Sequence, residues 1–311
     1  MRFDSKKTAF GRHETFFLRY GWLTKGFWKY LEYIDKSKTD IFKLDDAVVE
    51  LGVGKNMVAS IRYWLHATQL LQPDNSSSIS TPSQIGLKLM GAAQKPGWDP
   101  YLEDEGTLWL LHWLIASNSA SATTFFWFFN SYHKTHFTQD ELRTALSDFV
   151  KESVGLKVSP ATIKNDIAVL TRMYASTTND GKQSWDDVLD SPMAALDLIE
   201  SGVNREFKSY ASLKNTLPAE IVGYALSQIF EQRKVTAIPV SELIYSQEGW
   251  PAIGAVFRLQ ESQALSLIED AIDLFSEEFE INESAGIHQV YKTGNLQPIE
   301  FLSLYYAGNE M

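Results

Sequence analysis

The sequence contains no cysteine. This absence excludes zinc fingers, iron–sulfur clusters, cysteine nucleophiles and disulfide frameworks, and it fits a reducing compartment. Long apolar runs are missing as well, because no stretch approaches the roughly 18 consecutive apolar residues of a membrane span. Residues 1–14 have no apolar core of signal-peptide length. We therefore expect a cytoplasmic protein that does not associate with a membrane.

The common motifs of nucleotide binding and hydrolysis are also absent. The string GVGKN at 52–56 has neither the earlier glycine nor the hydroxyl that a phosphate-binding loop uses to hold a nucleotide and magnesium. There is no Gly-x-Ser-x-Gly elbow, no His-Glu-x-x-His pair and no dinucleotide fingerprint. We therefore do not expect an ATPase, and no motif of this kind assigns another activity.

The chain has ample material for packed cores. Its 311 residues include nine tryptophans and 13% aromatic residues, which argues against disorder. A chain of this length can form two or three domains without disulfides or structural metal. We predict a helix-turn-helix module at 1–75, a helical middle domain at 76–215 with a second such unit, and an acidic winged-helix-like domain at 216–311.

Charge is distributed unevenly along the chain, whose net charge is -11. Residues 1–70 contain 12 Lys and Arg against 8 Asp and Glu, whereas residues 221–311 contain 4 against 13. Phosphate responds to the local field within a Debye length of about 8–10 Å, so a basic module on an acidic chain can bind DNA. The acidic end would then face a protein partner or keep the molecule in solution. A chance fluctuation of surface charge is the alternative.

The best helix-turn-helix candidate lies at 44–69. Apolar residues of 44–51 fall on one helical face, Gly52 favours the left-handed conformation that ends a helix, and a second amphipathic helix follows. In this arrangement the start of the second helix enters the major groove, where lysine, arginine, serine and asparagine contact phosphates and bases. The predicted contacts are Lys55, Asn56, Ser60 and Arg62. An ordinary helical hairpin with a polar outer face is the alternative. Residues 73–78 are a turn or wing-like loop by composition.

Two further units have a related pattern. Thr138 and Glu141 form a capping box ahead of one helix, and Ser159 with Pro160 begins the next, whose polar face carries Lys164 and Asn165 as candidate DNA contacts. Because this face also carries Asp166, its charge is mixed in sign and DNA contact is less favoured there. Further on we predict helices at 219–233, 240–245 and 262–280 and a brief strand at 257–259, with a loop at 177–184. The fold class we expect is mainly α, with multiple winged-helix or helix-turn-helix-like modules and short β-wings.

One cluster of residues has the chemistry of phosphodiester cleavage. A histidine titrates near neutrality, a carboxylate can orient it or hold a divalent cation, and arginines stabilise a phosphate as charge develops. The candidate catalytic residues of this cluster are Arg12, His13, Glu14 and Arg19. Lys25 follows them in the sequence and would contact DNA. Alternatively, His13 and Glu14 cap a helix and Arg12 contacts a neighbouring carboxylate.

A second cluster contains Asp99, Glu103 and Asp104, followed by Glu105 and His112. Hard oxygen ligands at this density suit Mg²⁺ or Mn²⁺. Acidic residues ahead of a helix are also favoured by the helix dipole, at about 0.3–1 kcal/mol each. His112, between Trp109 and Trp113, could equally be a core residue with satisfied hydrogen bonds.

Three strings together resemble a prokaryotic family of formerly unknown function: GRHETF with RYGWLTK at 11–25, GVGKNMVASIRYWL at 52–65, and DPYLEDEGTLWLLHW at 99–113. Members of this family occur in DNA phosphorothioation operons, and one branch resembles the SspB component of the Ssp single-strand phosphorothioation system. The similarity extends more weakly through 158–174 and 185–199, so it covers most of the chain.

The resemblance implies a DNA nickase that opens one strand so that sulfur can enter the backbone. Its implied partners are DNA and the sulfur-transfer and ATPase components of a phosphorothioation complex, and a homodimer is compatible with it. It supplies no catalytic motif to match, so the nuclease candidates depend on the clusters described above. The alternative is a non-catalytic DNA-binding subunit that presents DNA to a modification or defence complex.

Overall fold

The computed structural model describes residues 1–74, 79–175, 191–202, 205–284 and 286–308. The loop predicted at 177–184 and part of the loop at 73–78 lie outside these residues. Within them the fold is mainly α with small antiparallel sheets, as the sequence predicts. Among the described residues, no helix has the length and apolar character needed to cross a membrane.

The first unit, residues 22–82, comprises three α-helices and a small antiparallel strand pair. Helix α1 is followed by a short 3-10 helix, η1, and then by α2 and α3. Strands β1 and β2 pair antiparallel, with Leu71 opposite Pro82. The bounds are α1 Trp22–Ser37, η1 Ile41–Lys43, α2 Ala47–Leu51, α3 Lys55–Ala67, β1 Leu71–Gln72 and β2 Thr81–Pro82.

The turn between α2 and α3 agrees with the expectation from the sequence. Gly52 ends α2 with a φ of 58°, a left-handed conformation that glycine adopts without a side-chain clash. The first helix is shorter than predicted, however, since it begins at Ala47 rather than at residue 44. Asp40 accepts a hydrogen bond from the Phe42 amide (3.1 Å) and starts η1, and Leu44 after η1 is extended, with φ -91° and ψ 147°, so the α-helix begins only after it.

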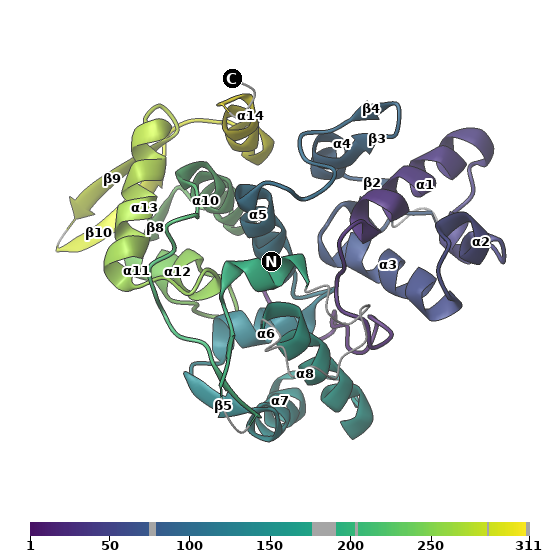
Figure 1. Cartoon of the computed structure of the whole chain (residues 1–311). Helices are drawn as coiled ribbons and strands as arrows, with labels where there is room; N and C mark the ends of the chain where they lie inside the picture. The colour runs from purple at the N-terminus through teal and green to yellow at the C-terminus, as the bar shows by residue number, and fades with distance from the viewer. Residues whose placement is uncertain (75–78, 176–190, 203–204, 285, 309–311) are drawn as a thin grey trace.

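A helical connection joins the first unit to the centre of the molecule. It contains α4 Gln84–Met90, the strand pair β3 Gly91–Ala92 and β4 Lys95–Pro96, and α5 Glu105–Ala116. Residues 106–116 of α5 are all buried, as its continuous apolar sequence predicts. Figure 1 shows α5 in the middle, with the first unit on one side and the helices of the C-terminal third on the other.

The second and third units follow a common order of one helix, one strand, three helices and two strands, where the third of the three helices is the 3-10 helix η2 in the second unit. In each, the last strand lies between the other two, in the antiparallel orders β5-β7-β6 and β8-β10-β9. The second unit contains α6 Thr123–Ser131, β5 His136–Thr138, α7 Gln139–Ser153, α8 Pro160–Tyr174, η2 Pro192–Leu196, β6 Glu200–Ser201 and β7 Glu206–Lys208. The third contains α10 Ala219–Arg233, β8 Ala237–Pro239, α11 Val240–Ile244, α12 Ile253–Val256, α13 Glu261–Leu274, β9 Phe279–Ser284 and β10 Ile287–Lys292, with α14 Pro298–Gly308 after it.

Several predicted helix starts are confirmed, and two predictions in the C-terminal third are wrong. The Thr138 and Glu141 side chains form the capping box, and Ser159 caps α8. The long acidic helix ends at Leu274 rather than near residue 280, because the chain from Phe279 pairs as β9 with β10. Residues 257–259 are not a strand, since Arg258 has a φ of 53° and only Leu259 forms a bridge.

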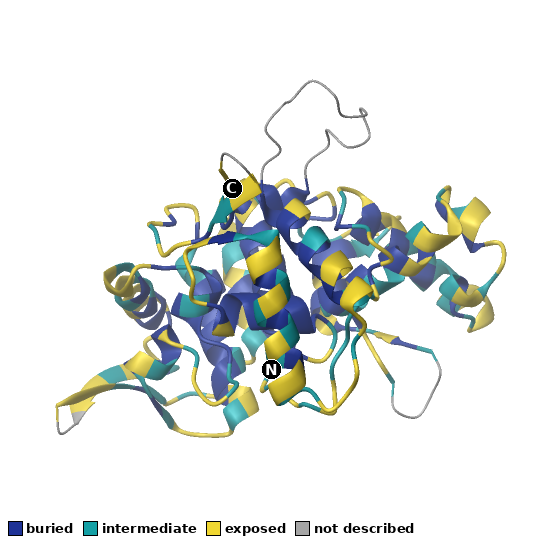
Figure 2. Ribbon diagram, turned by 90° about the horizontal axis from the view of Figure 1, so that it is seen from below, coloured by how far each residue is buried: buried dark blue, intermediate teal, exposed yellow. Residues whose placement is uncertain are grey.

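His112 links α5 to two other parts of the core. Its Nε2–H donates to the Val256 carbonyl and its Nδ1 accepts from the Tyr174 hydroxyl, both at 2.8 Å. The imidazole is therefore neutral and fully hydrogen-bonded, which agrees with the core alternative rather than with a metal ligand. Buried residues occupy the middle of the molecule around it, and exposed ones lie on the outer helices and loops (Figure 2).

This buried histidine predicts a pH dependence of stability. Burial lowers the pKa of His112 from 6.5 to about 3. Below pH 6.5 the unfolded chain therefore takes up a proton that the folded protein does not, and the stability falls as the pH falls. From pH 7 to pH 5 this residue should reduce the free energy of unfolding by about 2 kcal/mol. Urea unfolding of the wild type and of His112→Gln at both pH values measures it, and equal pH dependence in the two proteins would contradict it.

Candidate nucleic-acid interface

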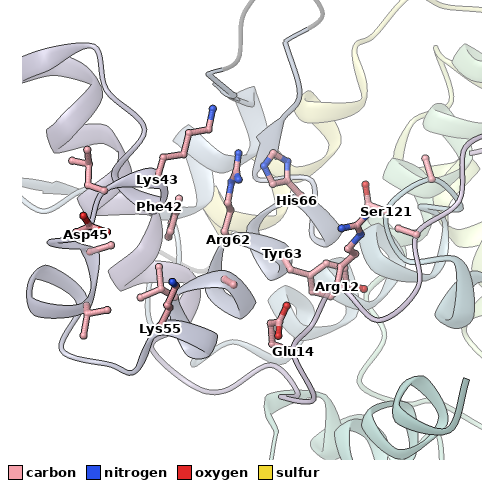
Figure 3. Close-up of a pocket in the computed structure, with 17 residues that line it drawn as sticks. Arg12, Glu14, Phe42, Lys43, Asp45, Lys55, Arg62, Tyr63, His66 and Ser121 are labelled. Carbon is pink, nitrogen blue, oxygen red and sulfur yellow. The ribbon is translucent and has the colours of Figure 1, made fainter. Parts of the chain in front are cut away.

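A cleft of about 670 Å³ lies between the N-terminal loop, residues 1–21, and the first unit. It combines residues from three segments that are distant in the sequence. We call it the basic cleft, and its charged and polar lining residues are Arg12, Glu14, Lys43, Asp45, Lys55, Arg62, Tyr63, His66 and Ser121. Figure 3 shows Arg12 and Glu14 on one side, Lys43 and Lys55 on the other, and Arg62 and His66 between them. Its four Lys and Arg side chains exceed its two lining carboxylates, and still exceed them when buried Asp40, which pairs with Arg62 and Lys43, is added, so the local field favours an anion.

The N-terminal loop enters the cleft through a tight turn. The Phe16 amide donates to the His13 carbonyl at 2.9 Å, and the two central residues, Glu14 and Thr15, have φ values of 49° and 68°. Left-handed backbone is uncommon for any residue except glycine and is least favourable for a β-branched one such as threonine. Such strain costs about 1–3 kcal/mol per residue and persists only where surrounding contacts enforce it.

Asp166 supplies these contacts from α8. Its Oδ1 accepts from the Gly11 amide (2.8 Å) and from His13 Nε2 (2.9 Å), and its Oδ2 accepts from the Thr124 hydroxyl (2.7 Å). The Thr15 amide donates to His13 Nδ1 at 3.1 Å, so the proton of the imidazole lies on Nε2 and faces Asp166. This buried network fixes the loop against the second unit.

The turn sends neighbouring side chains in opposite directions. His13 is 2% exposed and faces the core, whereas Arg12 and Glu14 are exposed and line the basic cleft. His13 therefore contacts the loop and Asp166 rather than anything bound in the cleft. Arg19 lies away from the cleft lining, half-buried over the rings of Phe16, Phe17 and Trp22 at 5.6–5.8 Å.

The residues predicted to contact DNA fall into three groups in the structure: those at the basic cleft, those exposed elsewhere and one that is buried. Lys55 and Arg62 line the basic cleft from α3, and Asn56 is exposed beside Lys55. Arg62 also pairs with buried Asp40 (3.1 Å), which holds its side chain in place. Ser60 is fully buried on the inner face of α3 and so cannot reach a ligand. Three others are exposed but do not line the cleft: Lys25, whose ammonium donates to the Leu51 carbonyl, and Lys164 and Asn165, next to Asp166 on α8.

Two of the three carboxylates predicted to bind metal, those of Asp99 and Asp104, have structural partners instead, and Glu103 is exposed. Asp99 is buried and accepts from the amides of Glu103 and Asp104, both at 3.0 Å. Asp104 caps α5 through the Thr107 amide and accepts from the Tyr305 hydroxyl. Among the described residues, no group of three or more His, Asp and Glu side chains is arranged to hold a metal ion. The position of Asp104 and Glu105 at the N-terminus of α5 agrees with the helix-dipole alternative.

Three residues of the site were not among the candidates predicted from the sequence: Tyr63 and His66, which line the basic cleft, and Asp166, which supports the N-terminal loop. Burial raises the pKa of Tyr63, with a further contribution from Asp166, so its phenol stays protonated. Burial and then Arg62 lower the pKa of His66, which keeps its imidazole neutral near pH 7. The sequence analysis predicts Asp166 on the polar face of this helix with Lys164 and Asn165, but it is buried in the structure. Its spacing, three residues after Ile163 and four before Leu170, is the signal that could have placed it on the buried face of α8.

We predict that Asp166→Ala releases the N-terminal loop. The substitution leaves three buried donors without their acceptor, which should lower the free energy of unfolding by about 3 kcal/mol. Trypsin should then cleave after the exposed Arg12 faster than in the wild type, as mass spectrometry of the fragments can measure. Asp148→Ala, which removes an exposed carboxylate paired with Lys151, is the matched control and should change neither quantity appreciably. Unchanged cleavage after Arg12 in Asp166→Ala would show that the network does not hold the loop.

Comparison with known proteins confirms the resemblance found in the sequence. A search of curated proteins finds no match. A magnesium ion-bound SspB crystal structure is similar with a TM-score of 0.81 and 28% identity, covering 96% of this chain and 88% of that one. Another SspB crystal structure has the same TM-score and identity, with 97% and 90% coverage. Residues 10–306 match the family described as a protein of unknown function (DUF4007), and the chain belongs to that family.

Proposed function

We propose that this protein is a DNA nickase of a phosphorothioation system. The observation that carries the proposal is the basic cleft, where Arg12 and Glu14 lie opposite Lys55 and beside Arg62. Phosphodiester cleavage needs cations that bind phosphate and a carboxylate that takes a proton or holds a metal ion. Similarity to SspB structures over most of the chain supports the assignment to an Ssp-type modification system.

The first unit would bind the duplex as a winged-helix-like module. Helix α3 follows a glycine turn, and its N-terminal residues Lys55 and Asn56 are exposed, which is the part of a recognition helix that meets the major groove. The β1–β2 pair follows α3 in the position of a wing. Lys164 and Asn165 on α8 would form a secondary contact from the second unit, and Lys25 a contact outside the cleft.

The proposed chemistry is hydrolysis of one backbone phosphodiester. Water loses a proton to Glu14 and its oxygen bonds to phosphorus, while the bond from phosphorus to one sugar oxygen breaks and that oxygen takes a proton from solvent. Arg12 would stabilise the negative charge that develops on the phosphate. His13 would act by holding the turn, because its side chain faces Asp166.

Magnesium or manganese fits the basic cleft better than it fits residues 99–104. Mg²⁺ is commonly held by one or two carboxylates together with substrate phosphates. Glu14 and Asp45 both bring an exposed carboxylate to the cleft, whereas the oxygens of Asp99 and Asp104 already accept backbone hydrogen bonds. A magnesium ion-bound SspB structure is compatible with Mg²⁺ as the metal. Bound there, the ion would polarise a phosphate oxygen.

The rival proposal is a DNA-binding subunit without catalytic activity. The observation in its favour is that the predicted histidine is buried and that the described residues hold no metal-ligating group of three. Both proposals place DNA at the basic cleft and the sulfur-transfer and ATPase components elsewhere. The acidic C-terminal third is the surface we assign to such partners or to a second copy of the chain.

A supercoiled-plasmid assay separates the two proposals. With Mg²⁺ or Mn²⁺ the wild type should convert plasmid to open circles, and Glu14→Gln should nick about 100-fold more slowly with unchanged DNA binding. Glu152→Gln alters an exposed carboxylate of α7 outside the cleft and serves as the control. Binding without relaxation by the wild type would favour the non-catalytic subunit, and full activity of Glu14→Gln would remove Glu14 from the chemistry.

Salt dependence of DNA binding tests the role of α3. Lys55→Ala should weaken binding and reduce the slope of log K against log salt by about 0.9, the value for one lost phosphate contact. Fluorescence anisotropy with a labelled duplex measures the slope between low and moderate salt. Lys151→Ala removes an exposed lysine of α7 and should leave it unchanged. An unchanged slope for Lys55→Ala would mean that α3 does not face the DNA.

A further inference from the structure

A second cavity lies between the second and third units, away from the basic cleft. Its volume is about 460 Å³, within the range of about 300–1,000 Å³ typical of small-molecule sites. Its polar lining comes from the segments after α6, after β7 and around α12: His133, Thr135, Ser209, Tyr210, Tyr245 and Arg258. Ile244, Ala255 and Leu259 give the remaining wall an apolar character.

Arg258 lies in the wall of this cavity, and all the groups that accept hydrogen bonds from its guanidinium are neutral. Its Nη2 donates to the carbonyls of Phe128 (2.8 Å) and Tyr132 (3.2 Å), its Nη1 to that of Phe129 (3.3 Å), and its Nε to Ser209 Oγ (3.2 Å). These contacts use four of the five N–H groups of a guanidinium, and one on Nη1 remains.

The charge of Arg258 lacks an acidic partner. In the described parts of the chain no carboxylate lies within ion-pair distance of it, whereas Arg62 pairs with Asp40 and Arg233 with Glu242. Burial lowers the pKa of Arg258 to about 10. Arg258 is half-buried, and even partial removal of a charge from water without a counter-charge is costly, so an anion in the adjoining cavity would offset that cost.

Ser209 offers a second donor at the same place. Its hydroxyl is buried and accepts from Arg258 Nε, which leaves the hydroxyl proton free to donate elsewhere. The imidazole of His133 lines the same cavity and can supply a third donor. Three donors from different segments match the several oxygens of a phosphate better than the two of a carboxylate.

We propose that this cavity binds a small organic phosphate of mononucleotide size, whose phosphate oxygens accept from Arg258 Nη1 and Ser209 Oγ. The apolar wall and the exposed rings of Tyr210 and Tyr245 would contact the organic part, since nucleobases stack on aromatic rings. Hydrogen bonds hold both rings in place: the Tyr210 hydroxyl donates to Glu200 and the Tyr245 hydroxyl to Glu261, each at 2.8 Å. The inference is independent of the nickase proposal, because none of these residues lines the basic cleft.

Titration calorimetry of the full chain with adenosine 5′-monophosphate, adenosine and inorganic phosphate tests the proposal. The monophosphate should bind with one site per chain, and adenosine should bind at least about tenfold more weakly because it lacks the charged acceptor. Ser209→Ala should weaken the monophosphate about tenfold, and Arg258→Lys should weaken it further. Arg233→Lys, whose arginine pairs with Glu242, is the control and should bind as the wild type does.

The alternative role of Arg258 is to cap the last carbonyls of α6 and nothing more. Absence of monophosphate binding, or binding that Ser209→Ala leaves unchanged, would establish that role and overturn the proposal. Thermal melting of each variant shows whether it is folded, and Ser209→Ala decides the result if Arg258→Lys does not fold. Labelled duplex binding at the basic cleft should be the same in Ser209→Ala and wild type, which separates this cavity from the DNA site.

Discussion

The buried carboxylate of Asp166 is the interaction on which the candidate site depends. It accepts hydrogen bonds from Gly11, His13 and Thr124, and so it connects the N-terminal loop, α6 and α8. A buried charge is tolerated only when its hydrogen-bonding capacity is used, and here the partners are also the groups that shape the turn. The strained conformation of Glu14 and Thr15, and with it the exposure of Arg12 and Glu14 in the cleft, follows from this anchor.

Local charge decides the character of the surface more than total charge does. The chain as a whole is acidic, yet its cleft contains Arg12, Lys43, Lys55 and Arg62 against Glu14 and Asp45. Part of the positive charge is held in place by carboxylates, as Arg62 is by Asp40, which keeps the side chain ordered before any ligand arrives. Preorganised cations lose less conformational entropy on binding a phosphate than mobile ones do.

The arrangement of the units explains how distant segments meet. The second and third units share an order of elements and a strand order without sharing a sequence, and α5 is buried between them and the first unit. Packing around one buried helix brings the start of the chain against α8, and the basic cleft forms on the other side of this loop, between it and the first unit. It also leaves Arg258, after α12, against the last carbonyls of α6. Such junctions between packed units are common places for ligand sites.

The sequence by itself determined the mainly α class, the helix starts at Thr138 and Ser159, the glycine turn before α3 and the SspB resemblance, because these depend on local propensity and short motifs. It also placed Arg12, Glu14, Lys55 and Arg62 among the candidates. Only the tertiary structure decided that these four share a cleft, that His13 and Ser60 are buried, and that Asp99 and Asp104 serve backbone amides. The burial of His13 depends on packing against Asp166, 153 positions away, which helical periodicity does not encode. The partners of Asp99 and Asp104 are local amides, but they form only once the chain before α5 takes its folded conformation.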